Sequence, residues 1–201
     1  MIAVIDYGIN NIASVAKALK KINAEFIVTN QKKEIEDSDT IILPGVGSFL
    51  EGMNTLKSLD LNTILIREIK EKKKKFLGIC LGMQMLATKG FEPEESLGLD
   101  LIGGKVEKIN TGSPFIKIPH MGWNNIKIIN PALFKNLNDD NFYFTHSYHF
   151  IPDDFNIVSA TVTHGVEMVA CLEKDNIVAV QFHPELSQQA GLTFLKNFLE
   201  R

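Results

Sequence analysis

The chain has 201 residues, of which 45% are hydrophobic, and its formal net charge is −3. This length and hydrophobic content suit a single domain, residues 1–201, with one well-buried core. The small negative charge gives no basic footprint for nucleic acid or an anionic membrane, and no run approaches the roughly 20 apolar residues that span a bilayer. The composition of the first residues leads us to expect no secretory leader, and the two cysteines lack the spacing of a zinc site or a disulfide framework. We therefore expect a cytoplasmic protein.

The first half of the chain alternates predicted strands with predicted helices. Apolar runs predict strands at residues 2–6, 25–29, 40–43 and 76–79, and helical spacing predicts helices at residues 11–22 and 56–72. Such alternation forms βαβ units, which give a parallel sheet with helices on both faces.

From about Gly98 the pattern changes to short apolar runs separated by Asn, Asp, Gly and Pro, which indicates hairpins. Predicted strands lie at residues 101–109, 125–129, 142–145, 157–163, 167–173 and 177–182, and an amphipathic helix lies at residues 190–199. The predicted fold class is therefore α/β, with a mixed, largely parallel central sheet flanked by helices.

Cys80 stands in the run Phe76-Leu77-Gly78-Ile79-Cys80-Leu81-Gly82-Met83-Gln84, where an apolar strand ends at a cysteine between two glycines. This is the cysteine counterpart of the G-x-S-x-G nucleophile elbow, in which a strand turns sharply into a helix. The glycines leave room for close strand–helix packing, and the helix start favours a thiolate. A small buried cysteine beside a glycine-rich turn is the alternative, and the motif alone leaves both open.

The candidate base is His183, at the end of the predicted strand 177–182, where active sites of open α/β sheets gather. Glu185 follows after Pro184 and is placed to fix the imidazole tautomer and stabilise its protonated form. Together with the Cys80 elbow, this pair indicates a Cys-His-Glu triad. His146 and His149 have no acidic or thiol neighbour at a metal-binding spacing, so we expect no metal and no cofactor.

The segments 78–84 and 181–185 resemble those of class I, triad-type glutamine amidotransferases. Three further segments are similar to those of the glutaminase subunits of imidazole glycerol phosphate synthases, enzymes of histidine biosynthesis. They are Pro-Gly-Val-Gly at 44–47, Pro-His-Met-Gly-Trp-Asn at 119–124 and Phe-Thr-His-Ser-Tyr at 144–148. The resemblance extends from Asp6-Tyr7-Gly8 to the final helix.

The resemblance implies that Cys80 attacks the side-chain amide of glutamine while His183, oriented by Glu185, moves the protons. The oxyanion would be held by the backbone N–H groups of Leu81 and Val46. The glycines beside Val46 would let its peptide rotate, so the oxyanion hole would be incomplete until a partner protein binds and triggers the rotation. The alternative for this segment is a simple tight turn.

The resemblance also implies two groups of binding residues. The positions around the substrate are Gln84, Glu92, Ser147 and Tyr148, and the positions at a partner interface are Asn11, Trp123 and Tyr143. Ordinary core or surface residues are the alternative at the interface positions, most of all at Tyr143.

The short segment after Glu185 suffices for one helix, so the sequence predicts no domain that would accept ammonia. Ammonia is mostly protonated near neutral pH, so we expect it to pass directly into a partner protein. By the resemblance this partner is a (β/α)8 cyclase subunit in a heterodimer that makes imidazole glycerol phosphate and AICAR.

Two residues depart from the family pattern. Leu186 replaces the usual lysine after His-Pro-Glu, which removes a possible ion pair with the partner, and Asn10 replaces a glycine but still tolerates left-handed backbone. These departures leave open a paralogue that supplies ammonia to a barrel partner modifying surface sugars. A stand-alone cysteine hydrolase and a binding module with an inactive triad are further alternatives.

Overall fold

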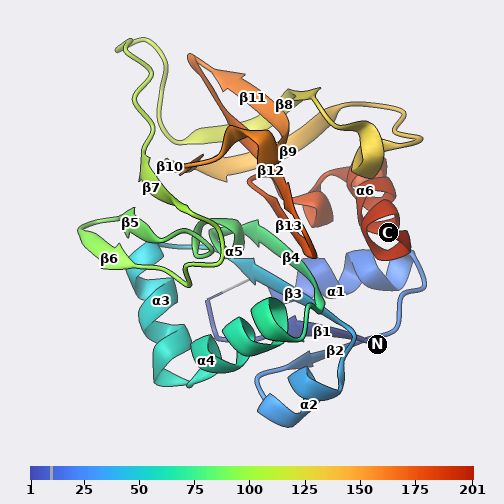
Figure 1. Ribbon diagram of the computed structural model, residues 1–201. Helices are drawn as coiled ribbons and strands as arrows, with labels where there is room; N and C mark the ends of the chain where they lie inside the picture. Colours follow the sequence, from blue (N-terminus) through green and yellow to red (C-terminus); the bar gives the residue numbers. More distant parts are fainter. Residues whose placement is uncertain (10) are drawn as a thin grey trace.

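The computed structural model describes residues 1–9 and 11–201, and its largest element is a nine-stranded sheet (Figure 1). The strands, in chain order, are β1 (Ile2–Ile5), β2 (Phe26–Thr29), β3 (Thr40–Gly45), β4 (Lys75–Cys80), β8 (His120–Ile128), β9 (Asn141–His146), β11 (Val158–His164), β12 (Val166–Lys174) and β13 (Ile177–Val180). Their spatial order is β2-β1-β3-β4-β13-β12-β11-β8-β9.

One half of this sheet is parallel and the other half is antiparallel. Neighbours from β2 to β13 run parallel, as the βαβ pattern predicts, and neighbours from β13 to β9 run antiparallel, as the hairpin pattern predicts. The predicted mixed α/β sheet is confirmed. Strands β4 and β13 lie side by side at its centre, with Ile79 opposite Val180.

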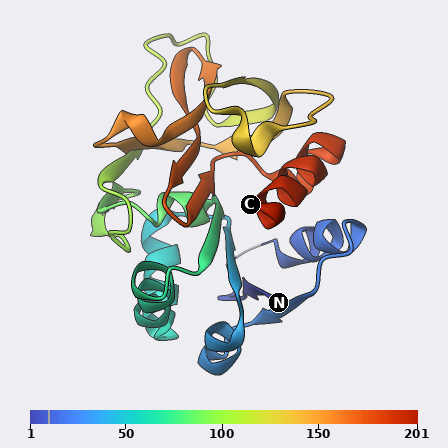
Figure 2. The same ribbon diagram turned by 45° about the vertical axis from the view of Figure 1, so that its right-hand side comes forward.

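Helices cover both faces of the parallel half (Figure 2). Helices α1 (Ile12–Lys21) and α6 (Gln188–Glu200) lie on one face, and α2 (Lys32–Asp37), α3 (Phe49–Ser58), α4 (Leu61–Ile66) and its π-helical continuation η1 (Arg67–Glu71) lie on the other. Alternate residues of β1 point to opposite faces: Ile2 and Val4 pack with α1 and α6, whereas Ala3 and Ile5 pack with α2, α3 and α4. The strand is therefore apolar throughout.

The helix predicted at residues 56–72 is wrong in its bounds. Helix α3 begins at Phe49, where the Ser48 hydroxyl oxygen accepts a hydrogen bond from the Glu51 N–H at 3.4 Å. The chain then breaks at Asp60, which has a left-handed φ of 51°, before α4 begins. The spacing of apolar residues in the sequence does not reveal this break, because α3 and α4 pack against the same core.

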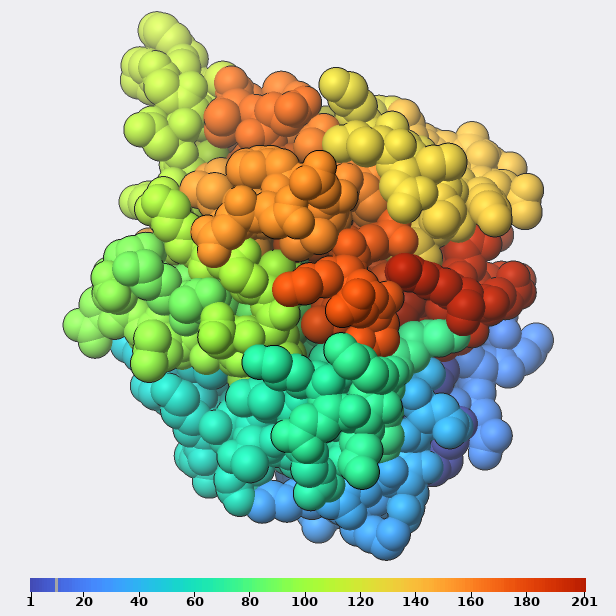
Figure 3. Space-filling model, in the orientation of Figure 1, coloured from blue at the N-terminus to red at the C-terminus, as the bar shows by residue number. Residues whose placement is uncertain are grey.

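A second, four-stranded sheet lies beside the Cys80 elbow. Its strands are β5 (Lys89–Phe91), β6 (Glu95–Leu97), β7 (Gly104–Lys108) and β10 (Tyr148–Pro152), in the spatial order β10-β7-β5-β6. Short helices complete the chain: α5 (Leu81–Gln84), η2 (Pro131–Phe134), η3 (Phe155–Ile157) and η4 (Pro184–Leu186). The connection between β7 and β8 projects from the body (Figure 3). Within residues 1–9 and 11–201, none of the helices has the length and apolarity needed to cross a bilayer.

Candidate active site

Cys80 is the last residue of β4 and immediately precedes α5. Its backbone has φ 54° and ψ −107°, an unusual conformation for a residue with a Cβ, and its side chain is 6% exposed. Such strain costs roughly 1–3 kcal/mol and persists only where the surroundings impose it. The predicted strand–turn–helix elbow is thus present at this cysteine.

The elbow needs glycine at position 82. A Cβ on Gly82 would lie 1.8 Å from the Leu43 carbonyl oxygen of β3, and one on Gly78 would lie 2.8 Å from the Gly82 carbonyl oxygen. Both obstacles are backbone atoms, so no side-chain movement relieves them. The predicted role of the two glycines, close strand–helix packing, has a direct steric reason.

We expect Gly82→Ala to destabilise the fold by about 3 kcal/mol, because the added methyl group overlaps backbone that cannot move aside. Urea unfolding followed by circular dichroism measures this loss. The control is Gly112→Ala, whose Cβ meets nothing within 4 Å at a φ of 66° and which should cost about 1 kcal/mol. Equal losses in the two variants would contradict the steric account.

His183 follows β13 and forms a buried pair with Glu185. The Nδ1 atom of His183 lies 2.7 Å from Oε1 of Glu185, and the two side chains are 3% and 2% exposed. Burial lowers the pKa of His183, but the negative charges of a Cys80 thiolate and of Glu185 outweigh it and raise the pKa well above its ordinary value. The Nε2 atom is buried and has no hydrogen-bond partner among the described residues, so it is available to exchange a proton with a reacting group.

Two polar groups lie close to the Cys80 sulfur, and the charge of Cys80 acts on a third. The Gln181 amide nitrogen lies 3.5 Å from Sγ, and the Thr145 carbonyl oxygen lies 3.9 Å from it. The buried Tyr7 hydroxyl has no partner among the described residues, and burial, followed by the charge of Cys80, raises its pKa. Neither Gln181 nor Tyr7 is among the predicted site residues, although both stand in the segments that carry the resemblance.

A cavity of about 150 Å³ opens beside the sulfur. Its lining residues are Val46, Gly47, Cys80, Gln84, Glu92, Thr145, His146, Ser147 and Tyr148. The structure therefore brings together the cysteine and all four positions predicted to surround the substrate, although they come from three separate segments, 80–84, 92 and 147–148. His146, which the sequence analysis set aside, also lines this cavity.

Gln84 is held by two hydrogen bonds. Its amide nitrogen donates to the Tyr148 carbonyl oxygen and to Oε1 of Gln181, both at 3.0 Å. Both amide protons are used, and no described residue donates to the Gln84 carbonyl oxygen. That oxygen is what Gln84 offers to a ligand in the cavity.

Glu92 also contributes to the fold. Its Oε2 atom accepts a hydrogen bond from the Phe49 N–H at 3.1 Å, and its carbonyl oxygen accepts one from Leu50 at 3.2 Å, so it caps the start of α3. Burial raises the pKa of Glu92, although the Phe49 hydrogen bond opposes this effect.

The two backbone N–H groups predicted for the oxyanion hole differ in whether a carbonyl oxygen of the chain already accepts their hydrogen bond. Leu81 is the first residue of α5, so its N–H has no intrahelical acceptor. The Val46 N–H, in contrast, donates to the Ile9 carbonyl oxygen at 3.3 Å and is therefore occupied. Gly47 next to it has a φ of 97°, which only glycine adopts easily.

A family model described as "Glutamine amidotransferase class-I" matches residues 3–201. Subunit HisH of imidazole glycerol phosphate synthase from Geobacter sulfurreducens is 45% identical, over 99% of this chain and 98% of its own length. The subunit HisH from Methanothermobacter thermautotrophicus is also 45% identical, over 100% of this chain and 98% of its own length. The chain belongs to the HisH family of class-I glutamine amidotransferases.

Solved structures agree on the fold of this HisH-family chain. A glutamine amidotransferase crystal structure has a TM-score of 0.78, with 18% identity, over 100% of this chain and 98% of its own. PurLQS from Thermotoga maritima has a TM-score of 0.68, with 19% identity, over 99% of this chain and 97% of its own. At such identities the likeness concerns the fold alone.

The predicted interface residues of this HisH-family chain lie near the surface. Trp123 is 47% exposed and packs edge-on against Tyr143, with ring centroids 6.0 Å apart. The two are cross-strand neighbours on β8 and β9. Asn11 precedes α1 and is half-buried, and its side chain makes no capping hydrogen bond. The interface role of all three stays a prediction.

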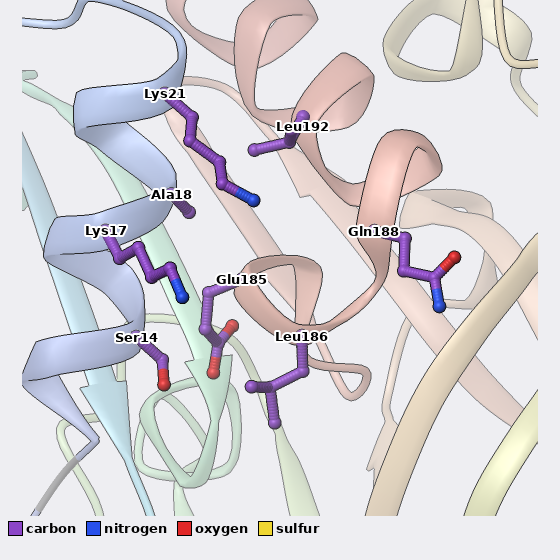
Figure 4. Close-up of a pocket in the computed structure, with 8 residues that line it drawn as sticks. All are labelled: Ser14, Lys17, Ala18, Lys21, Glu185, Leu186, Gln188 and Leu192. Carbon is purple, nitrogen blue, oxygen red and sulfur yellow. The ribbon is translucent and has the colours of Figure 1, made fainter.

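Leu186 lines a cavity of about 270 Å³ between α1 and the start of α6. Figure 4 shows Lys17 and Lys21 on α1 facing the loop that carries Glu185 and Leu186. Neither lysine forms an ion pair with a described residue, so positive charge remains near the position where the family usually has a lysine. The other departure, Asn10, lies outside the described residues.

His120 and His146 form a buried pair between β8 and β9. Burial is the main cause that lowers the pKa of His120 to about 4 and that of His146 to about 3, and the neighbouring His164 lowers the former further. Both imidazoles are therefore neutral at pH 7.

This pair predicts a loss of stability in mild acid. Below pH 6.5 both imidazoles become protonated in the unfolded chain, whereas in the folded chain they stay neutral down to about pH 4. The unfolded chain therefore binds more protons, and the free energy of unfolding falls as the pH falls. Each histidine contributes at most about 1.4 kcal/mol per pH unit. His183, whose pKa is raised, stays charged in the folded chain while the unfolded chain gains its proton near pH 6.5, so it acts in the opposite direction and offsets part of this loss. Urea unfolding at pH 7 and pH 5 should show a shallower slope for His146→Phe, and an unchanged slope would contradict this.

Proposed function

We propose that this chain is the glutaminase subunit of an imidazole glycerol phosphate synthase. It hydrolyses glutamine to glutamate and ammonia and passes the ammonia to a (β/α)8 cyclase partner, which makes imidazole glycerol phosphate and AICAR in histidine biosynthesis. The single observation that carries the proposal is the cavity in which Cys80 meets the four predicted substrate residues. The identity with HisH subunits over the whole chain supports it.

Transfer of the Cys80 thiol proton to Nε2 of His183 gives the thiolate–imidazolium pair from which catalysis begins, and the raised pKa of His183 favours this pair. The thiolate attacks the side-chain amide carbon of glutamine, and the carbonyl oxygen becomes an oxyanion. Glu185 stabilises the imidazolium, since its carboxylate accepts a hydrogen bond from the His183 Nδ1–H at 2.7 Å. The short distance and deep burial of this pair support its role as base and orienting group.

Collapse of the tetrahedral intermediate breaks the carbon–nitrogen bond. His183 donates its proton to the departing nitrogen, which leaves as ammonia, and a glutamyl thioester remains on Cys80. His183 then takes a proton from water, the hydroxide attacks the thioester, and glutamate leaves as the thiol is restored.

The state of the oxyanion donors supports dependence on the partner. Leu81 offers one N–H, but the Val46 N–H is bonded to the Ile9 carbonyl oxygen. Removal of one oxyanion donor costs about 10²–10³ in turnover in other enzymes. Rotation of the peptide beside Gly47 upon partner binding would free the second donor. The isolated chain should therefore hydrolyse glutamine slowly.

Trp123 is proposed to anchor the partner, because an exposed indole packed on a neighbouring ring is typical of binding hot spots. We expect Trp123→Ala to weaken the complex with the cyclase subunit by about 2 kcal/mol, as measured by isothermal titration calorimetry. The control is Phe155→Ala, which removes a 66% exposed aromatic side chain of η3. An equal effect of both variants would contradict the proposed interface.

Glutamate release from glutamine, with and without partner, tests the function. We expect slow release by the chain alone and strong stimulation by the cyclase subunit with its bound ligand. Fast release without partner would indicate a stand-alone hydrolase. Stimulation only by a barrel protein of another pathway would indicate the paralogue that Leu186 leaves open.

A cytoplasmic site of action is part of this proposal. Cys80 and Cys171 are both free thiols, which suits a reducing compartment.

A further inference from the structure

A chain of polar side chains leads from strand β8 to the wall of the cavity beside Cys80. The Asn124 amide nitrogen lies 3.0 Å from Nε2 of His120, and Nδ1 of His120 lies 2.9 Å from Nε2 of His146. The Nδ1 atom of His146 lies 2.9 Å from the Tyr148 carbonyl oxygen. We call these three side chains the histidine chain.

The two ends of the histidine chain determine where its protons lie. A carbonyl oxygen only accepts, so Nδ1 of His146 carries a proton toward Tyr148. The Asn124 amide nitrogen also lies 2.9 Å from the Thr163 carbonyl oxygen, which orients the amide and directs its other proton to Nε2 of His120. The proton between the rings therefore belongs to Nδ1 of His120. Both rings are neutral Nδ1–H tautomers, since a further proton would make two N–H groups face each other.

The surroundings hold these rings firmly. His120 and His146 are directly opposite each other on β8 and β9 and are 3% and 6% exposed. The His120 ring is stacked between Phe144 and His164, with centroid distances of 4.7 and 4.4 Å. Within the described residues no group of three His, Cys, Asp or Glu side chains is arranged to hold a metal ion, so a metal site does not explain the pair.

The histidine chain ends at the group that holds Gln84. The Tyr148 carbonyl oxygen accepts from His146 and also from the Gln84 amide nitrogen, and the same nitrogen donates to Gln181, whose amide reaches Sγ of Cys80. The other end of the histidine chain lies on β8, whose side chains point alternately inward and toward the surface. Met121 and Trp123 are 63% and 47% exposed, directly beside His120 and Asn124.

We propose that His120 and His146 are positioning residues of the cavity beside Cys80. His146, oriented by His120, donates a hydrogen bond to the Tyr148 carbonyl oxygen, which also accepts from the Gln84 carboxamide. The two histidines thereby connect the cavity to the strand that exposes Met121 and Trp123. The identity of the ligand as glutamine rests on the proposed function. This role gives a physical reason for the segment Pro-His-Met-Gly-Trp-Asn. Met121 and Trp123 face the side proposed for the partner. His120 and Asn124 belong to the histidine chain that supports the cavity.

Nitrogen-15 NMR of the isolated chain, labelled on its histidines, tests the geometry without any assay of activity. At pH 7 we expect His120 and His146 to show a protonated Nδ1 and an unprotonated Nε2. Asn124→Asp replaces the donor by an acceptor, so His120 should gain a proton on Nε2. An Nε2–H tautomer of His146 in the unmodified chain, or no change at His120 in the variant, would overturn the proposal.

Kinetics test the consequence. His146→Phe keeps an aromatic ring but removes both hydrogen bonds, and in the complex with the cyclase subunit it should raise KM for glutamine about tenfold with little change in kcat. Ammonium-dependent synthesis should be unchanged. The matched control is His149→Phe on β10, outside the histidine chain, which should leave KM unchanged. A loss in kcat alone, or equal effects in both variants, would overturn the proposal. If the unmodified complex releases no glutamate, the proposed function fails, while the NMR result still decides the histidine chain.

Discussion

Replacing Cys80 by alanine is expected to abolish glutamine-dependent synthesis by the complex, while ammonium-dependent synthesis survives. The variant has no nucleophile to form the thioester, and loss of a nucleophile in comparable triads lowers turnover by about 10⁶-fold. Ammonium-dependent synthesis uses the partner's site alone. Product formation with glutamine and with ammonium salts, measured on the same complex, gives both rates.

Cys171→Ala is the matched control for this prediction. Cys171 is the other free cysteine, is fully buried on β12, and has its thiol pKa raised mainly by burial, so it is unsuited to attack a substrate. We expect this variant to keep glutamine-dependent synthesis. Persistent glutamate release by Cys80→Ala would show that the nucleophile is another residue.

Glu185→Gln is expected to lower kcat for glutamine hydrolysis by about 10³–10⁴-fold. The carboxylate accepts a hydrogen bond from the His183 Nδ1–H and stabilises the positive charge of the ring, whereas a glutamine side chain supports the wrong tautomer as readily as the right one. The loss should appear in kcat rather than in KM, because Glu185 does not line the cavity beside Cys80. Steady-state kinetics of the complex measure the two constants separately.

The same variant should also change the pH dependence. Cys80 and Glu185 together raise the pKa of His183, so removing the Glu185 charge lowers that pKa. The paired thiolate and imidazolium are then lost at a lower pH as the pH rises. Alkylation of the thiol, followed against pH, checks this direction. Glu107→Gln, an acid on β7 that pairs with Lys105, is the control and should change neither the rate nor the pH profile.

The triad was predictable because each of its parts has a local sequence signal. Cys80 stands between two glycines, and His183 follows an apolar strand and precedes Pro-Glu. Their approach across the chain follows from the topology, since β4 and β13 are parallel neighbours and both end at the same edge of the sheet. A parallel arrangement of this kind is the expected result of βαβ units.

Other parts of the site depend on contacts that no local pattern encodes. The sequence gives His146 no role, because neither it nor His149 has an acidic or thiol neighbour at a metal-binding spacing. Its partner His120 becomes apparent only when β8 and β9 are paired in register. The direction of the Val46 N–H depends on the Ile9 carbonyl oxygen from a distant turn. The three-residue strands β5 and β6 are likewise too short to carry a periodic signal.

The glutamyl thioester provides the most direct test of the proposed reaction. Radiolabelled glutamine is mixed with the complex of the unmodified chain and the cyclase subunit, the reaction is stopped with acid within one turnover, and the digested peptides are counted. We predict label on the peptide that contains Cys80, with none on the peptide that contains Cys171. Glutamate release without labelled Cys80, or label on another residue, would contradict the account.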